Sequence, residues 1–147
     1  MLSGMLSRIF FGSYHYLYTM STTQSGKTLL TETRDLMRRL HYSIHTERAY
    51  CDWIARFVRF HHMQARETLF VEPEKKVEDY LTYLAVQANV AAATQNQAFN
   101  ALVFLYKRVL DRPLENVEAT HSKLQAIQEE IHQRRVEDSP WAQRQYL

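Results

Sequence analysis

The chain has 147 residues, of which 46% are apolar, and it carries a formal net charge of +2 with a sequence pI of about 8.7. This length fits one ordinary domain with a real core and short flanks. The weak positive charge is compatible with a nucleic-acid partner without requiring one. Three Gly, three Pro and the lack of alternating Val or Ile runs favour helices over a β-sandwich or barrel, so we expect an all-α fold.

Cysteine content and hydropathy indicate which cellular location the protein fits. The single Cys51 excludes an internal disulfide and a cysteine-rich zinc site, which suits a cytoplasmic location. No apolar stretch approaches the roughly 20 residues that span a bilayer, so no membrane partner is expected. Residues 1–26 are predicted to be a disordered leader and linker. The apolar part of this leader is broken by polar residues and lacks a signal-peptide cleavage site, and Met20 is a plausible true start.

Two helices joined by a turn are predicted between residues 28 and 62. The first runs from about Thr28 to Leu40, with leucines and a methionine at helical spacing. Residues 41–45 form the turn, in which Ser43 or Thr46 can cap the second helix. The second helix is the strongest in the chain, because its apolar residues recur at i, i+3, i+4 and i+7. They are Tyr50, Trp53, Ile54, Phe57, Val58 and His61, and the opposite face carries Arg48, Asp52, Arg56 and Arg59.

Two further helices are predicted after Pro73, which fits the first turn of a helix. A short connection around Asn89 follows the third helix. Thr94 and Gln97 have the spacing of a capping box, so the fourth helix is predicted to begin there and to end before Asp111. The predicted core face of the third helix is Val77, Tyr80, Leu81, Leu84 and Ala88. That of the fourth is Phe99, Leu102, Val103, Tyr106, Val109 and Leu110, with Gln97, Phe104 and Arg108 further round.

The character of the sequence changes after Pro113. Leu124, Ile127 and Ile131 give only a thin apolar stripe within Glu- and Arg-rich sequence. This pattern predicts a marginal helix that is followed by a polar tail.

Several segments share the order and spacing of one known family. They are Leu40-His-Tyr-Ser43, Thr46-Glu-Arg-Ala-Tyr50, Trp53-Ile54, Arg56-Phe-Val-Arg-Phe-His61, Tyr80-Leu81 with Leu84, and Thr94-Gln-Asn-Gln-Ala98 running into residues 101–110. On these residues, the span from about residue 29 to residue 117 resembles the N-terminal core-binding domain of tyrosine recombinases, the phage-integrase superfamily. Within that superfamily it is most similar to the integron integrases.

The resemblance implies a four-helix SAM-like bundle that forms one half of a clamp around duplex DNA. In the family, a second and larger domain carries the nucleophilic tyrosine and the cations that stabilise the transition state. Too few residues follow Pro113 for such a domain. We therefore expect a non-catalytic DNA-binding domain at residues 27–117 and a divergent helical tail at residues 118–147, monomeric when free.

Candidate DNA contacts lie on the basic and amide-rich helix faces. Arg and Lys supply phosphate affinity and little sequence information, whereas Asn and Gln can make paired hydrogen bonds to adenine. The alternative for the arginines is a solvated face in which Asp52 pairs with Arg48 or Arg56. The resemblance favours DNA, because this helix faces DNA in the family. The predicted contacts are Arg38, Arg39, His45, Thr46, Arg48, Arg59, Thr94, Gln95, Asn96, Asn100 and Lys107.

A catalytic site within this chain is disfavoured. His132 and Arg135 reproduce the His-x-x-Arg spacing of the recombinase active site, and Tyr146 follows. Phosphoryl transfer needs several cationic groups fixed around one phosphate, which a lone thin helix cannot provide. The same spacing also recurs between His45 and Arg48.

Metal, nucleophile and base-stacking roles are also disfavoured. The pairs His41 with His45, and His61 with His62, lack a third ligand, so capping or packing is expected and no cofactor is implied. Cys51 has no base placed beside it by spacing and is expected to be a small core or surface thiol. The spacing of the aromatic residues in the second helix favours core positions over a platform for single strands.

Two other functions stay open on the sequence. One is a helical protein-interaction module, for example a regulator that pairs with full-length recombinases through the helix that contains Leu124, Ile127 and Ile131. The other is a gene fragment without function.

Overall fold

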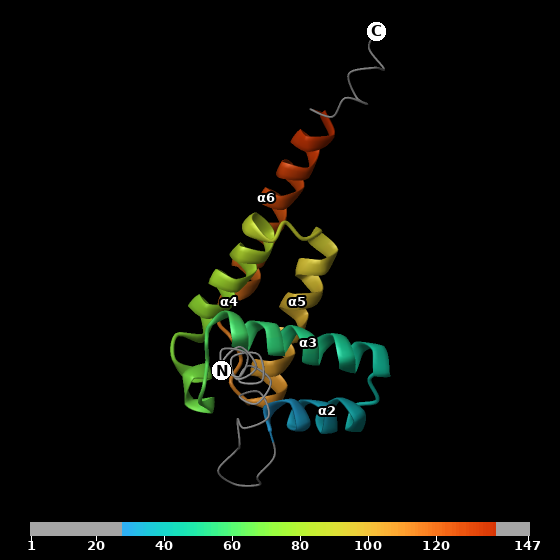
Figure 1. The fold of residues 1–147 in the computed structure, drawn as a ribbon, viewed down its shortest axis with the longest axis vertical. Coiled ribbons are helices and arrows are strands. Elements are labelled where there is room, and N and C mark those ends of the chain that lie inside the picture. Colours follow the sequence, from blue (N-terminus) through green and yellow to red (C-terminus); the bar gives the residue numbers. More distant parts are fainter. Residues whose placement is uncertain (1–27, 138–147) are drawn as a thin grey trace, which may run out of the picture.

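The computed structural model describes residues 28–137; the predicted leader, Met20, the linker and Tyr146 lie outside the described residues. Figure 1 shows an arrangement of helices, and the prediction of an all-α fold is confirmed. Within the described residues, the α-helices are α2 (Leu29–Arg39), α3 (Ile44–Phe60), α4 (Pro73–Thr82), α5 (Ala92–Phe104) and α6 (Val117–Glu137). Shorter elements are the 3₁₀-helix η1 (Arg66–Phe70) and the π-helical turns η2 (Tyr83–Gln87) and η3 (Leu105–Val109), which continue α4 and α5.

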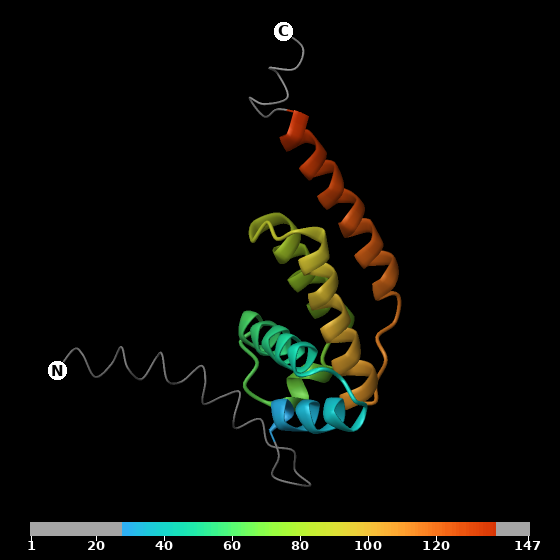
Figure 2. The ribbon, with the colours of Figure 1, turned by 90° about the vertical axis from the view of Figure 1, so that its right-hand side faces the viewer.

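Helix α5 lies at the centre of the molecule. It packs against α3, α4 and α6, while α2 packs against α3 and η3. Figure 2 shows α3 on one side of α5 and α6 on the other. One side of α5 carries the exposed residues Asn96, Gln97 and Asn100, which these helices leave uncovered. This open side is the part of α5 that a ligand can reach.

The α2–α3 hairpin is fixed by caps and an ion pair. Thr28 caps α2, and the Ser43 hydroxyl caps α3 by accepting a hydrogen bond from the Thr46 N–H at 3.2 Å, which confirms the predicted cap at Ser43. Arg38 at the end of α2 donates two hydrogen bonds of 3.0 Å to the Glu47 carboxylate in the first turn of α3. The hydrogen bonds hold the pKa of Glu47 below its usual value and raise the pKa of Arg38.

The buried face of α3 agrees with the predicted one. Trp53, Ile54, Phe57 and Val58 are buried, while Tyr50 and His61 are half-buried. Aromatic residues from several elements surround Phe57: its ring centroid lies 5.6 Å from that of Tyr80, 6.4 Å from that of Tyr106 and 5.0 Å from that of His61. The core therefore forms where α3 meets α4 and η3.

The predicted core face of α4 is correct except at its end. Val77, Tyr80, Leu81 and Leu84 are buried, but Ala88 is exposed and Ala85 is buried instead. The reason is the π-helical turn η2, in which the Ala88 N–H bonds to the Tyr83 carbonyl at 2.9 Å. This wider turn rotates the following residues away from the 3.6-residue period on which the prediction rested.

The start of α5 differs from the prediction. Ala91 is the N-cap residue, without a side-chain cap, so Thr94 lies inside the first turn and the predicted capping box does not form. Alanines have the strongest helix propensity, and here residues 91–93 extend the helix upstream of Thr94. The shift turns Gln95 inward: its side chain is fully buried, and its Nε2 donates to the Leu81 carbonyl at 3.0 Å.

The remainder of α5 and η3 follows the predicted pattern with one correction. Phe99, Leu102 and Tyr106 are buried as expected, and the outer members of the set are half-buried. Phe104 was predicted to lie outside the core face of this helix, but it is buried. The ring centroids of Tyr42 and Tyr50 lie 5.5 and 5.7 Å from that of Phe104 and cover it. The α3 side of the helix is therefore a second buried side, which a single apolar stripe did not predict.

Helix α6 packs along the bundle through part of its length. Val117 and Leu124 belong to the main core, and the His121 ring stacks on Phe99 with centroids 4.0 Å apart and an interplanar angle of 6°. Gln128 is buried, and its Nε2 donates to the Val90 carbonyl. Ile127, in contrast, is 38% exposed. Figure 2 shows the last turns of α6 extending past the start of α5.

Acid should weaken the docking of α6. Burial lowers the pKa of His121, so the folded state favours the neutral ring. As the pH falls, the unfolded chain binds a proton at this histidine before the folded chain does. The neutral His121 ring therefore contributes fully to stability well above pH 6.5, the pKa of an unperturbed histidine. This contribution declines as the pH falls below 6.5. We expect His121→Phe, which keeps a flat ring on Phe99, to reduce the loss of unfolding free energy between pH 7.5 and 5.5.

The comparison is made by urea denaturation at the two pH values. His132→Phe, on an exposed turn of the same helix, is the matched control and should keep the wild-type pH dependence. Some dependence should persist in His121→Phe, because burial also lowers the pKa of His61. Equal pH dependence in both variants would contradict the assignment to His121.

Candidate nucleic-acid interface

The outward face of α3 is polar and basic. Arg48, Asp52, Arg56 and Arg59 are all exposed, as predicted. Among the described residues, Asp52 forms no ion pair with Arg48 or Arg56, so the alternative of a self-paired surface is not supported. Arg56 instead stacks over Trp53, with its Cζ 4.9 Å from the ring centroid. On this face, Arg48 and Arg56 are therefore exposed without an ion pair to Asp52.

At the α2–α3 turn, two of the four predicted contact residues have structural partners. The Arg38 side chain is 62% exposed, but its guanidinium is bound to Glu47 in a bidentate pair. The Thr46 hydroxyl lies 2.9 Å from that of Ser43 and takes part in the cap. Arg39 and His45 are exposed. Arg38 and Thr46 therefore shape the hairpin, whereas Arg39 and His45 are accessible to a ligand.

The uncovered side of α5 presents amides. Asn96 and Asn100 are exposed along it, Thr94 is half-buried, and Lys107 is exposed in the π-helical turn η3 that follows. Gln95 was predicted to join them, but it lies in the core with its Nε2 bound to the Leu81 carbonyl. The prediction for Gln95 was wrong because it assumed a helix that begins at Thr94 and points the next residues to solvent.

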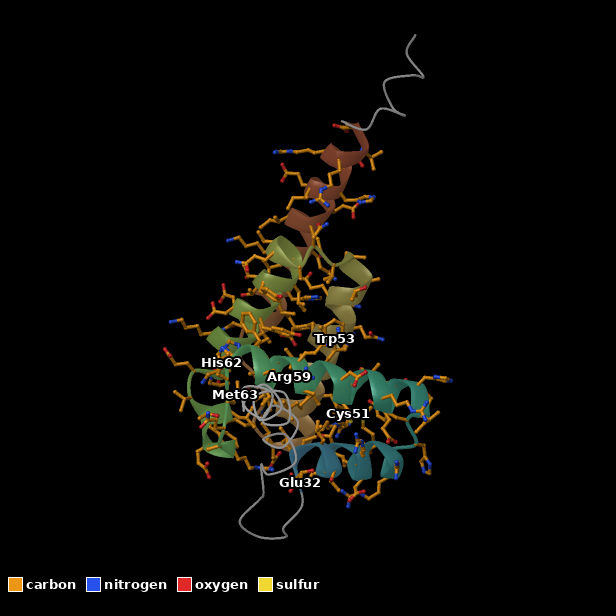
Figure 3. The ribbon with its side chains drawn as sticks, in the orientation of Figure 1. Glu32, Cys51, Trp53, Arg59, His62 and Met63 are labelled. Carbon is orange, nitrogen blue, oxygen red and sulfur yellow. The ribbon has the colours of Figure 1, made fainter. Side chains whose placement is uncertain are left out.

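A contact between α3 and α5 was missed. The Trp53 Nε1–H donates to Gln97 Oε1 at 3.0 Å, across 44 residues of sequence. Figure 3 shows Trp53 where α3 passes α5. One signal was available, since a buried indole N–H needs an acceptor. The spacing of residues within either helix could not identify Gln97 as that acceptor.

Residues 29–116 match the family described as phage integrase, N-terminal SAM-like domain. The chain belongs to this family. Two relatives named "Integrase/recombinase", from Escherichia coli and Pseudomonas aeruginosa, are each 40% identical to it over 82 residues. These alignments cover 56% of this chain and 23% of each relative, so the chain spans about a quarter of the length of the relatives it matches.

The described residues of this phage integrase SAM-like domain give little support for a metal site or a nucleophilic cysteine. Residues 28–137 contain no group of three or more His, Cys, Asp or Glu that could hold a metal ion. The His61 ring is bound to the Lys76 carbonyl at 2.7 Å, and it is the half-buried helix-end histidine that was predicted. Cys51 is buried, which raises the pKa of its thiol and disfavours the thiolate.

The His-x-x-Arg pair of the tail lies on α6. Both His132 and Arg135 are exposed there, next to the connection at Asn89 and Val90. The two side chains line a surface pocket between α6 and this connection. Within the described residues, no other cationic side chain lines the pocket, so the pair lacks the converging charges that phosphoryl transfer requires. Among the same residues, no helix has the length and apolar character needed to cross a membrane.

Proposed function

We propose that this chain holds duplex DNA as the DNA-binding part of a site-specific recombinase and does not itself cut DNA. The observation that carries the proposal is the placement of α3 and α5. The two helices pack side by side, and their outward faces present exposed arginines from one and exposed amides from the other. Membership in the phage integrase SAM-like family and the names of its relatives support the same function.

The charges and amides divide the proposed interface into two roles. An α-helix fits the major groove, where Asn side chains can read base edges, so Asn96 and Asn100 are placed at the bases. Positive side chains supply salt-sensitive affinity for phosphates. In this proposal the phosphate contacts are Arg39, Arg48, Arg59 and Lys107, and His45 and Thr94 lie at the border of the interface.

The proposal also names the subfamily of recombinases to which the chain is assigned. Residues Leu40-His-Tyr-Ser43 and Thr46-Glu-Arg-Ala-Tyr50 resemble those of the integron integrases. These residues form the turn between α2 and α3 and the first turns of α3, which include the Ser43 cap and Glu47. We assign the chain to the integron integrase type on this basis, and to a cytoplasmic protein that is monomeric when free of DNA.

Salt dependence tests the proposed interface. For duplex DNA, log affinity should fall by about 0.9 per phosphate contact for each log unit of salt. Replacing both Arg48 and Arg59 by alanine should weaken binding to every sequence and reduce that slope by roughly 1.8. The measurement is a titration of a labelled duplex by fluorescence anisotropy at several salt concentrations.

The matched control removes two positive charges elsewhere. Lys75 on α4 and Lys123 on α6 are exposed and lie on neither α3 nor α5. The double variant Lys75→Ala with Lys123→Ala should keep the wild-type slope. An equal change in both double variants would show that net charge, and not this face, determines binding.

One observation favours a second candidate, a module that binds another protein. Ile127 and Val136 on α6 are 38% and 48% exposed, and the last turns of α6 extend past the bundle. A partner such as a full-length recombinase could cover them. No binding of duplex DNA at low salt, together with binding to a recombinase, would favour this candidate over the first.

A further inference from the structure

We infer that Gln97 and Arg56, both held by the Trp53 indole, form a reading element that presents hydrogen-bond donors and selects guanine in the major groove. This inference rests on the proposed function, because it names a base that the α3–α5 face would recognise. Gln97 was not among the contacts predicted from the sequence. Gln97 and Arg56 are both exposed, whereas Trp53 between them is 6% exposed.

The hydrogen bond from Trp53 determines the orientation of the Gln97 amide. The indole has one N–H and no acceptor, so the atom 3.0 Å from it must be the Gln97 oxygen. The carbonyl side of the amide therefore faces the protein, and Nε2, with its two N–H groups, is the part left for a ligand. A paired contact with adenine requires the oxygen and the nitrogen to face the base together. The indole occupies one of the two lone pairs of Oε1 and turns that oxygen toward the protein, so Gln97 is oriented to donate from Nε2 and not to make the paired contact.

Arg56 adds a second set of donors at the same indole. Its Cζ lies 4.9 Å from the Trp53 ring centroid, which is within the range of a cation–π contact. The guanidinium carries five N–H donors, and the Arg56 side chain is exposed, so donors remain for a ligand beside this contact. Arginine has no acceptor atom. The two side chains that contact Trp53 therefore both present donors.

Guanine is the base that matches such a pair. Its major-groove edge carries two acceptors, N7 and O6, whereas adenine presents one acceptor and one donor. Asn96 and Asn100 differ from Gln97, because within the described residues neither has a hydrogen bond that would fix its amide. They keep both amide atoms for adenine. The face would thus read guanine beside Trp53 and can read adenine further along α5.

The test is selection from a random duplex library by the full chain, followed by sequencing of the bound DNA. Wild type should enrich a guanine, and replacing that guanine by 7-deazaguanine should weaken binding. Trp53→Phe removes the indole N–H and frees the Gln97 amide to turn. We expect guanine-over-adenine discrimination at that position to fall by roughly tenfold, the scale of one paired base contact. Gln97→Glu should reduce the same preference, and it decides the test if Trp53→Phe does not fold.

Tyr80→Phe is the matched control, since it changes a buried aromatic residue on α4 that takes no part in the Trp53–Gln97 hydrogen bond. It should enrich the wild-type sequence. If Trp53→Phe and Gln97→Glu also enrich the wild-type sequence with equal strength, this inference is overturned while the proposed function stands. Binding by wild type without a guanine preference has the same meaning. No binding of DNA by wild type would overturn both.

Discussion

Replacing Phe57 by alanine should lower the free energy of unfolding by about 3–5 kcal/mol. Phe57 is fully buried, and its ring lies against rings of Tyr80, Tyr106 and His61. The truncation loses the transfer energy of the ring and leaves a cavity among side chains that cannot collapse into it. Since domains of this size are stable by only about 5–15 kcal/mol, this loss is a large fraction of the total stability.

Urea denaturation followed by circular dichroism measures this loss. Arg48→Ala is the matched control on the same helix, because its side chain is exposed and its removal should change stability by less than about 0.5 kcal/mol. A loss below about 1 kcal/mol for Phe57→Ala would show that the packing of α3 on α4 and η3 is wrong.

Replacing Gln95 by glutamate should destabilise the fold by about 3 kcal/mol or more at pH 8. The Gln95 side chain is fully buried and donates from Nε2 to the Leu81 carbonyl. A carboxylate at this position loses the donor, faces a carbonyl oxygen and places a charge in the core. Because burial favours the neutral carboxyl, part of the loss should be recovered as the pH is lowered toward 5.

The measurement is the free energy of unfolding of wild type and variant at pH 8 and pH 5, with the difference between them compared at each pH. Asn100→Asp makes the same change of amide to acid on the exposed side of α5 and should be nearly neutral in stability. A stable Gln95→Glu variant with reduced DNA affinity would restore the surface role first predicted for Gln95. The buried position leads us to expect the opposite.

Regular periodicity accounts for the parts of the fold that the sequence predicted well. The buried residues of α3 and the Ser43 cap agree with the structure, because both depend on neighbours within one or two helical turns. The errors occur where a distant residue or a change of period intervenes. Ala88 follows a π-helical turn, and Phe104 is buried by Tyr42 and Tyr50 from another part of the chain.

The candidate site was predictable to a similar degree. The exposed basic face of α3 follows from the same periodicity that defines its core. The capping box was wrong because Thr94 and Gln97 satisfy the motif by spacing alone, while the alanines before them start the helix earlier. Gln97 bonds to Trp53 instead, and a pairing across 44 residues depends on how α3 and α5 pack.

The packing of α6 makes the folding unit longer than the stretch shared with relatives. The family match ends at residue 116, yet Val117 and Leu124 belong to the main core and His121 covers Phe99. A protein shortened to the shared stretch would expose these apolar contacts to water, and such surfaces promote aggregation. Exchanging this domain between members of the family therefore requires a junction after Gln128, whose amide donates to the Val90 carbonyl.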